Sequence, residues 1–223
     1  MFDDRRDAGR QLASDLLRFK GQDPVVLALP RGGVPVGFEI AQALGAPLDL
    51  ILVRKIGAPF QPELAIAAVV DGEKMELVLN EDLLRALSLS EDYVREQSVR
   101  QLEEIERRRR LYLEGRERVA IEGKTALVVD DGIATGATMR AALRAVRRRK
   151  PRRLVLAVPV APPEAVGLLQ AEVDEVVCLA TPDDLGAIGS FYFDFHQVGD
   201  EEVRELLERA APVQKHPNAP DAA

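Results

Sequence analysis

The feature that most constrains the fold is a series of five short apolar runs, each long enough for one buried strand. They cover residues 24–29, 48–53, 125–129, 154–158 and 173–179. A first helix is expected over residues 4–20, and further helices over residues 35–45, 137–149 and 163–170. Strands with few internal polar positions that alternate with helices are typical of a parallel sheet covered on both faces. The sequence therefore predicts an α/β fold built on a doubly wound parallel sheet.

Residues 54–120 interrupt this alternation. Two apolar runs at residues 65–70 and 75–79 flank Asp71-Gly72, a pattern typical of a β-hairpin, and a long charged helix is expected from a Ser90 cap to about Leu113. We therefore expect a single domain over residues 1–211, in which residues 54–120 form a flap or insertion subdomain. The proline-containing tail, residues 212–223, is expected to be mobile.

Composition and charge exclude several classes of protein. The chain has 223 residues with one cysteine and two histidines, so neither an internal disulfide nor a histidine-rich metal centre can form. The net charge of −7 argues against non-specific nucleic-acid binding by the whole molecule. The longest nearly apolar stretch, residues 154–163, is shorter than the roughly 18 residues of a membrane-spanning helix, and the N-terminus shows no secretion signal. A cytoplasmic protein without a membrane partner is expected.

The segment most specific for chemistry is the run VVDDGIATGAT from Val128 to Thr138. It places Asp130 and Asp131 directly after an apolar strand, at the edge where open parallel sheets bind ligands. The glycine- and threonine-rich turn that follows leads into a helix, so its backbone N–H groups meet at the positive end of the helix dipole. Such a turn suits a phosphate monoester, and two adjacent carboxylates suit a vicinal diol. The pattern therefore predicts a site for a ribose 5-phosphate.

Other phosphate-binding motifs fail on particular residues. A Walker loop needs a lysine at its end, and no lysine lies between Lys124 and Lys150. Gly132 and Gly136 do not have the spacing of a dinucleotide fingerprint. A receiver-type phosphoacceptor site also has acids at a strand end, but it does not require the threonine-rich turn.

The same eleven residues resemble the phosphoribosyl pyrophosphate (PRPP) signature of the type I phosphoribosyltransferases, and the order of elements over residues 24–180 is similar to that fold. The resemblance implies a Mg²⁺-dependent enzyme that transfers ribose 5-phosphate from PRPP to an acceptor nitrogen, such as that of a nucleobase, and releases pyrophosphate. Asp130 and Asp131 would contact the ribose hydroxyls. The turn that would hold the 5-phosphate consists of Ala134, Thr135, Gly136, Ala137 and Thr138. The sequence identifies neither the metal ligands nor the acceptor.

A second glycine-containing loop ends the first strand. Gly32 and Gly33 let the backbone approach an anion closely, and Arg31 offers two donors. An ordinary tight turn before a helix is the alternative interpretation. Beside the signature, the loop resembles the family's pyrophosphate loop, which often contains a non-proline cis peptide; the Arg31–Gly32 bond is the candidate.

The run after residue 53 contains two adjacent basic residues, Arg54 and Lys55. They could be ordinary solvated charges, but the family often has a basic residue here that binds pyrophosphate. Because neighbouring residues alternate sides along a strand, only one can face the site, and we favour Lys55. Residues 56–80 match the position of the family's mobile flap. The resemblance thus implies that Arg31, Lys55, Asp130 and Asp131 act in catalysis.

A late segment, residues 190–196, is rich in aromatic side chains. If it is extended, Phe191, Phe193 and Phe195 share one face, as in a small hydrophobic cluster. Late segments in this family often form a hood over the acceptor, so Tyr192 is a candidate acceptor contact. His196 is interpreted as structural rather than as a general base.

Residues 140–153 hold eight basic side chains and no acid. A solvated helix face explains them most simply. The alternative is a PRPP-sensing regulator that binds nucleic acid on the same fold and lacks transferase activity. No nucleic-acid-binding motif accompanies the patch, so the enzyme, with PRPP and a small-molecule acceptor as partners and a homodimer as the default assembly, is the favoured interpretation.

Overall fold

A computed structural model describes residues 1–71 and 76–210 of the chain. Its centre is a five-stranded sheet with the strand order β2-β1-β6-β7-β8, in which every neighbouring pair is parallel. The strands are β1 (Pro24–Ala28), β2 (Leu48–Leu50), β6 (Thr125–Val129), β7 (Arg153–Val160) and β8 (Glu175–Ala180). The α/β fold with a parallel sheet that the apolar runs predicted is confirmed.

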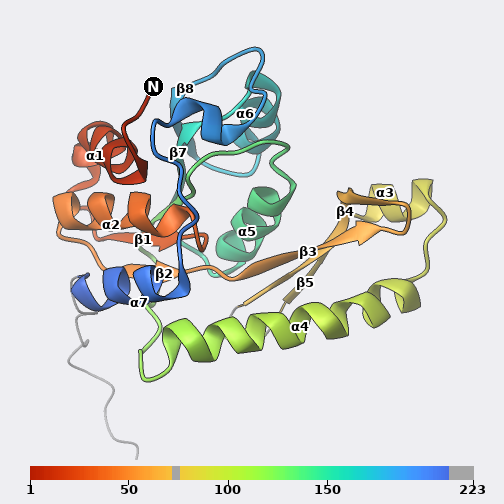
Figure 1. Cartoon of the computed structure of the whole chain (residues 1–223). Helices are drawn as coiled ribbons and strands as arrows, with labels where there is room; N and C mark the ends of the chain where they lie inside the picture. The colour runs from red at the N-terminus through yellow and green to blue at the C-terminus, as the bar shows by residue number, and fades with distance from the viewer. Residues whose placement is uncertain (72–75, 211–223) are drawn as a thin grey trace, which may run out of the picture.

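Helices cover both faces of this sheet (Figure 1). Val26 and Ala28 of β1 pack toward one layer, whereas Val25 and Leu27 pack toward the other, as the alternation along a strand requires. The first layer consists of α1 (Arg5–Leu16), α2 (Gly33–Leu44) and α7 (Asp200–Arg209). The second consists of α5 (Ala137–Arg148) and α6 (Pro163–Gln170). Short 3₁₀ turns, η1 (Leu17–Phe19) and η2 (Ile188–Phe191), complete the parallel part.

The insertion forms a second, antiparallel sheet with the order β3-β4-β5. Its elements are β3 (Val53–Ala58), β4 (Gln61–Val70), β5 (Glu76–Leu79), α3 (Glu81–Ala86) and α4 (Glu91–Leu113). Together they extend to one side of the parallel sheet (Figure 1). The hairpin prediction is confirmed, and α4 begins after the predicted cap, because the side chain of Ser90 accepts a hydrogen bond from the N–H of Tyr93 at 3.2 Å.

One predicted strand is wrong at its C-terminal end. The apolar run 48–53 was expected to be one strand of the parallel sheet, but the chain leaves that sheet after Leu50 and continues into β3. Ile56 and Val69 of the second sheet pack toward α4, whereas Ala68 and Val78 pack toward α5. The antiparallel sheet is therefore held between two helices and shares its core with the parallel part.

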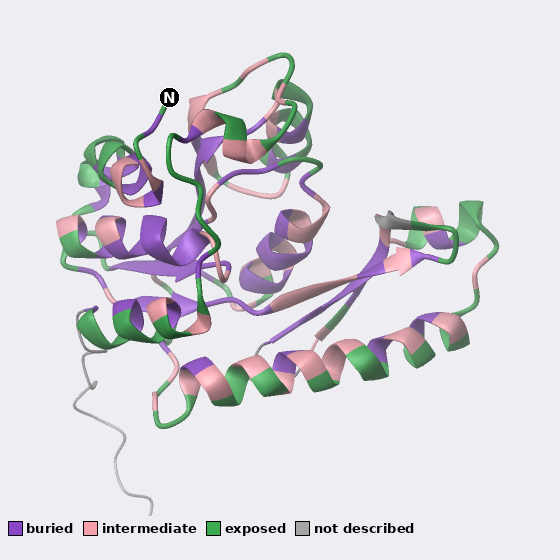
Figure 2. Cartoon of the chain, viewed as in Figure 1, coloured by how far each residue is buried: buried purple, intermediate pink, exposed green. Residues whose placement is uncertain are grey.

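Burial is concentrated in the parallel sheet and on the inner faces of its helices, while α4 shows a mixed surface (Figure 2). Among residues 1–71 and 76–210, no helix combines the length and the apolar character that spanning a bilayer requires. The tail that was expected to be mobile, residues 212–223, lies outside the described residues.

Candidate functional site

The two signature carboxylates stand directly after β6. The backbone N–H of Asp131 donates to Asp130 Oδ1 at 2.9 Å. Burial of the Asp130 carboxyl group, and then the negative charge of Asp131, raise the pKa of Asp130 well above its usual range. The end of β6 therefore concentrates negative charge in a poorly solvated place, where a ligand that donates hydrogen bonds or carries positive charge is favoured.

The glycines of the first loop lie against this acid pair. A Cβ atom added to Gly32 would stand 2.0 Å from Asp131 Oδ2, and one added to Gly33 would stand 2.8 Å from the Val129 carbonyl oxygen. Only glycine fits at such distances, so the loop and the acid pair form one compact surface. The structure thus brings the backbone of Gly32 and Gly33 against Asp130 and Asp131, as the sequence suggested.

The cis peptide bond in this loop is not the predicted one. It joins Pro30 and Arg31, one bond before the expected Arg31–Gly32 position. The loop motif marks the segment, but its residue types do not distinguish between neighbouring bonds.

The turn from Ala134 to Thr138 leads into α5. Gly136 has φ of 78° and caps the helix, a conformation that favours glycine. Within the described part of the chain, no acceptor is bonded to the backbone N–H groups of residues 134–138. Ala134 and Thr135 are exposed. The turn therefore presents free donors at the positive end of a helix, as a phosphate cradle requires.

Arg31 points away from the acid pair toward α7. Its Nη1 lies 3.6 Å from Asp200 Oδ1, and the hydroxyl of Tyr112, at the end of α4, donates to the same oxygen. Burial and the hydrogen bond to Asp200 raise the pKa of Tyr112 to about 12, so the phenol stays protonated near neutral pH. A negatively charged ligand at the loop would compete with Asp200 for Arg31.

The structure places Lys55 within a strand rather than after one. It lies on β3 opposite Ala68 of β4, half-buried, and shares the face of Val53, which packs toward the α5 side. Arg54 lies on the other face, where its Nε donates to Gln101 Oε1 of α4 at 3.1 Å. The two basic residues do alternate sides, and Lys55 is the one on the α5 side.

Tyr192 does not occupy an acceptor surface. Its side chain is 6% exposed, its ring packs between Phe2 and Phe195, and its hydroxyl donates to the Asp131 carbonyl oxygen at 2.5 Å. Burial and the charge of Asp131 raise the pKa of this phenol. The prediction that Tyr192 contacts the acceptor is wrong, because neighbouring aromatic rings cover the face that would stack on a base.

The aromatic segment is not one extended strand either. Phe191 ends the 3₁₀ turn η2, Phe193 is 76% exposed, and Phe195 lies beneath an arginine. The three phenylalanines therefore do not share a face. His196 is half-exposed and its ring contacts Glu202 and Asp194, which raise its pKa in that order.

Sequence reasoning missed Arg5. This side chain from α1 is only 7% exposed, and its Nε donates to Asp131 Oδ2 at 2.7 Å. A signal for its burial did exist. Arg5 stands three residues before Ala8 and seven before Leu12, on the apolar stripe of the first helix. A charged residue at a buried position indicates a specific partner.

Five of the eight basic side chains of residues 140–153, on α5 and at the start of β7, pair with acids. Arg140 and Arg144 both donate to Glu172 Oε1, at 2.7 and 2.9 Å. The further ion pairs are Arg147–Asp174, Arg148–Glu76 and Arg153–Glu175. These arginines form a solvated, internally compensated face, which leaves little net positive charge for a nucleic acid.

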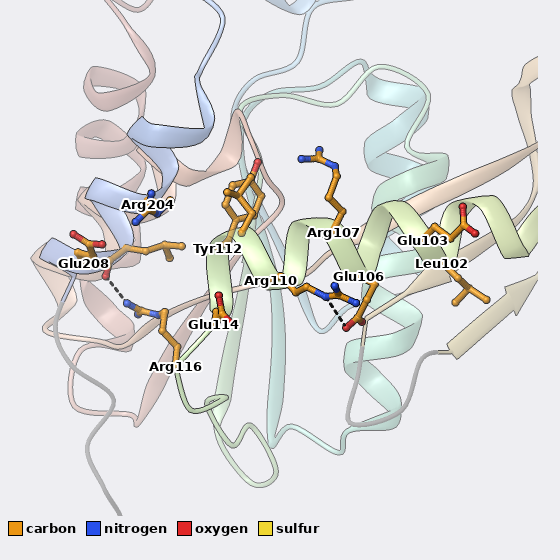
Figure 3. A pocket seen from close by; sticks show the side chains of 12 residues that line it. Leu102, Glu103, Glu106, Arg107, Arg110, Tyr112, Glu114, Arg116, Arg204 and Glu208 are labelled. Atoms are coloured by element: carbon orange, nitrogen blue, oxygen red, sulfur yellow. Dashed lines mark hydrogen bonds and ion pairs between the residues drawn. The ribbon is translucent and has the colours of Figure 1, made fainter.

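One cavity adjoins the site and another lies apart from it. One, of about 600 Å³, separates β4, β5 and α3 from α5, and Thr135 and Ala137 of the turn line it. The other, of about 1040 Å³, lies between α4 and α7 (Figure 3). Arginines and glutamates alternate on its wall, with Arg110 paired to Glu106 at 3.7 Å and Arg116 donating to the Leu207 carbonyl oxygen at 2.9 Å. The smaller cavity adjoins the signature, and the larger one does not.

The described residues contain no group of three or more metal-ligating side chains. Mg²⁺, however, is usually held by one or two carboxylates and by the phosphates of its substrate. The paired carboxylates of Asp130 and Asp131 fit a cation of that kind when it arrives with a phosphorylated ligand.

Comparisons with known proteins agree on one family. Residues 77–196, more than half of the chain, match the model of the phosphoribosyl transferase domain. Two Mycobacterium tuberculosis proteins named for a phosphoribosyl transferase, from strains CDC 1551 and H37Rv, are 48% identical over the whole chain. The chain spans half of their length.

Solved structures support the fold. The crystal structure of TT1426 from Thermus thermophilus is 46% identical and superposes with a TM-score of 0.85, over 95% of this chain and 99% of that one. The AQ2163 protein of Aquifex aeolicus, 13% identical, shares the fold with a TM-score of 0.51, over 94% of this chain and 87% of that one. With the parallel sheet and the signature at its edge, these matches lead to one conclusion: the chain belongs to the phosphoribosyl transferase family.

Proposed function

We propose that the protein transfers ribose 5-phosphate from PRPP to an acceptor nitrogen and releases pyrophosphate. The observation that carries the proposal is the joint surface of three segments at the end of β6: the acid pair, the turn 134–138 with free N–H groups, and the glycine loop packed against the acids. A diol site beside a phosphate cradle and an anion loop matches the three polar parts of PRPP.

Catalysis in this proposal is mainly positioning and electrostatics. Asp130 and Asp131 bind the ribose hydroxyls, and their charge favours the positive charge that develops at the anomeric carbon. Gly32 offers its backbone N–H to the departing pyrophosphate, whereas the N–H of Gly33 donates to the Leu29 carbonyl oxygen at 3.1 Å and holds the loop in place. Arg31, released from Asp200, and Lys55 add positive charge there.

Phosphoribosyltransferases generally use Mg²⁺ with PRPP, and the donor set fits this ion. When bound with the substrate, Mg²⁺ would neutralise the pyrophosphate oxygens. The protein's contribution is to orient the diol beside it through Asp130 and Asp131.

We also propose that residues 54–120 act as the flap. The antiparallel sheet packs on α5 directly beside the phosphate turn, and the 600 Å³ cavity lies between them. Closure of this sheet over the turn would exclude water, which would otherwise hydrolyse the activated sugar.

Replacing Lys55 with alanine is expected to lower turnover by about 10- to 100-fold, because a cation near the leaving group is lost. The melting temperature should change little. Steady-state kinetics with PRPP, together with thermal melts, measure both quantities. Arg54→Ala is the matched control, because this neighbour contacts α4 on the opposite face and should lose stability rather than turnover. Equal turnover in Lys55→Ala would exclude Lys55 from the reaction.

The function is tested by a pyrophosphate-release screen with PRPP, Mg²⁺ and a panel of purines, pyrimidines and other amines. Release that depends on one acceptor supports the transferase. If PRPP binds but no acceptor gives release, affinity for duplex DNA and hairpin RNA at two salt concentrations tests the regulator; salt-sensitive binding would favour it. The compensated arginines of α5 lead us to expect no such binding.

A further inference from the structure

The first residues of the chain are joined to the aromatic segment near its end. The N–H of Phe2 donates to the Phe191 carbonyl at 2.8 Å, and the N–H of Phe193 returns a bond to the Phe2 carbonyl at 2.9 Å. The N–H of Asp194 donates to the Asp3 carbonyl at 2.8 Å. Residues 2–3 and 191–194 therefore form one paired unit, which we call the terminal clasp.

Arg5 connects the terminal clasp to the acid pair. Its Nε donates to Asp131 Oδ2 and its Nη1 to the His196 carbonyl, both at 2.7 Å. The guanidinium carbon lies 3.7 Å from the centre of the Phe195 ring. A planar group held on its edge by two acceptors and on its face by a ring has little freedom.

Asp131 is held from several directions as a result. Arg5 binds one carboxylate oxygen, and the hydroxyl of Tyr192 binds the carbonyl oxygen of the same residue. Gly32 approaches the carboxylate so closely that no side chain fits between them. Oδ2 of Asp131 is engaged by Arg5, and the Asp130 carboxyl group lies within hydrogen-bonding reach of the Asp131 side chain.

We propose that Arg5 is a positioning residue for the sugar site: it binds Asp131 Oδ2 and so holds the carboxylate in the orientation in which it accepts from a ribose hydroxyl. This inference rests on the proposed function. Arg5 does not touch the substrate; it acts through Asp131. Ribose affinity then depends on a side chain from the first helix, outside the signature and outside the glycine loop.

The contacts of residue 5 require an arginine and not merely a positive charge. Two separate acceptors and an aromatic face match the fork and the plane of a guanidinium, whereas a lysine ammonium at this place supplies a point charge and cannot satisfy all three. A lysine variant should therefore recover part of the function, and a neutral variant should recover none.

The experiment measures PRPP affinity with Mg²⁺ by calorimetry, and kcat and KM by pyrophosphate release, for wild type, Arg5→Lys and Arg5→Gln. For Arg5→Gln we expect affinity to fall by about 10- to 100-fold, the loss typical of a hydrogen bond to a charged group. Arg5→Lys should lie between this variant and wild type, and KM should rise more than kcat falls. A purely structural role would reduce the active fraction, and hence kcat, but leave Kd unchanged.

Arg6→Gln is the matched control. Arg6 follows on the same helix and forms an ion pair with Glu39 on its other side, so its loss should leave PRPP affinity unchanged. Tyr192→Phe serves as a second test in case Arg5→Gln does not fold. It removes the hydroxyl that binds the Asp131 carbonyl oxygen without emptying a buried site, and it is expected to weaken PRPP binding by a smaller factor. Failure of wild type to bind PRPP would overturn the proposed function itself. Wild-type binding together with unchanged affinity in Arg5→Gln, or in Arg5→Lys and Tyr192→Phe if Arg5→Gln does not fold, would overturn only the role of Arg5.

Discussion

Asp130→Asn is expected to weaken PRPP binding by about 10- to 100-fold and, at the same time, to raise the melting temperature. The binding loss follows from removing a charged acceptor for a ribose hydroxyl. With Asp131→Asn added, binding should fall below detection. The stability gain follows from the raised pKa of Asp130, because burial and the neighbouring acid disfavour the ionised form of this carboxyl group in the folded chain.

The stability gain should depend on pH with a defined sign. An unfolded aspartate ionises at a pH near 4, whereas folded Asp130 ionises at a higher pH, so ionisation costs stability as pH rises between the two values. Asparagine removes this cost, and its Oδ1 can still accept from the Asp131 N–H. The gain should be largest at neutral pH, about 0.5–2 kcal/mol, and shrink toward pH 4.

Thermal melts from pH 4 to 8 and calorimetric titration with PRPP test both halves of this prediction. Asp15→Asn, an exposed aspartate on the outer side of α1, is the control and should show neither effect. A fall in melting temperature for Asp130→Asn at neutral pH would contradict the burial argument. Unchanged PRPP affinity in the double variant would refute the assignment of the acid pair.

The second large effect is expected for Gly33→Ala. In most helices this change is favourable by about 0.5–1 kcal/mol. Here the new methyl group would stand 2.8 Å from the Val129 carbonyl oxygen and 2.9 Å from Asp130 Cα, both backbone atoms that cannot rotate away. Overpacking of about 1–3 kcal/mol outweighs the helix gain, so the variant should be less stable. Displacing the loop by even about 1 Å should also lower kcat/KM by about 100-fold.

Gly167→Ala provides the matched control. Gly167 lies within α6, and an added Cβ would meet nothing within 4 Å, so the same substitution should leave activity intact and stabilise slightly. Melting curves and steady-state kinetics of the two variants make the comparison. Wild-type kcat/KM in Gly33→Ala would show that the loop does not need its close approach to the acids.

The parallel sheet could be predicted from the sequence because its strands are buried on both faces. Such strands are continuous apolar runs, and they can be recognised in the sequence without knowing which strands they pair with. The acid pair and the turn were located for a related reason: their positions relative to a strand end and a helix start are local. The hairpin of the insertion and the cap at Ser90 were likewise set by nearby residues.

Apart from the position of the cis peptide bond, the errors concern partners that are distant in sequence. Nothing in the apolar run 48–53 marks the point where the chain exchanges the parallel sheet for the antiparallel one, because both sheets accept the same side chains. The sequence suggests Tyr192 as an acceptor contact because it does not show that Phe2 covers this ring. That contact joins segments from opposite ends of the described chain. The role of Arg5 was missed for the same reason, since its partner lies 126 residues away.

The terminal clasp has a consequence for how the protein is made. During translation, residues 2–5 emerge long before residues 191–196, which carry the groups that they bind. Until then Arg5 has no carbonyl or ring to hold it, and the nascent chain carries Asp131 without this restraint. Biosynthesis therefore completes the proposed sugar site late, because Arg5 gains its ring and carbonyl partners only once Phe195 and His196 have been made.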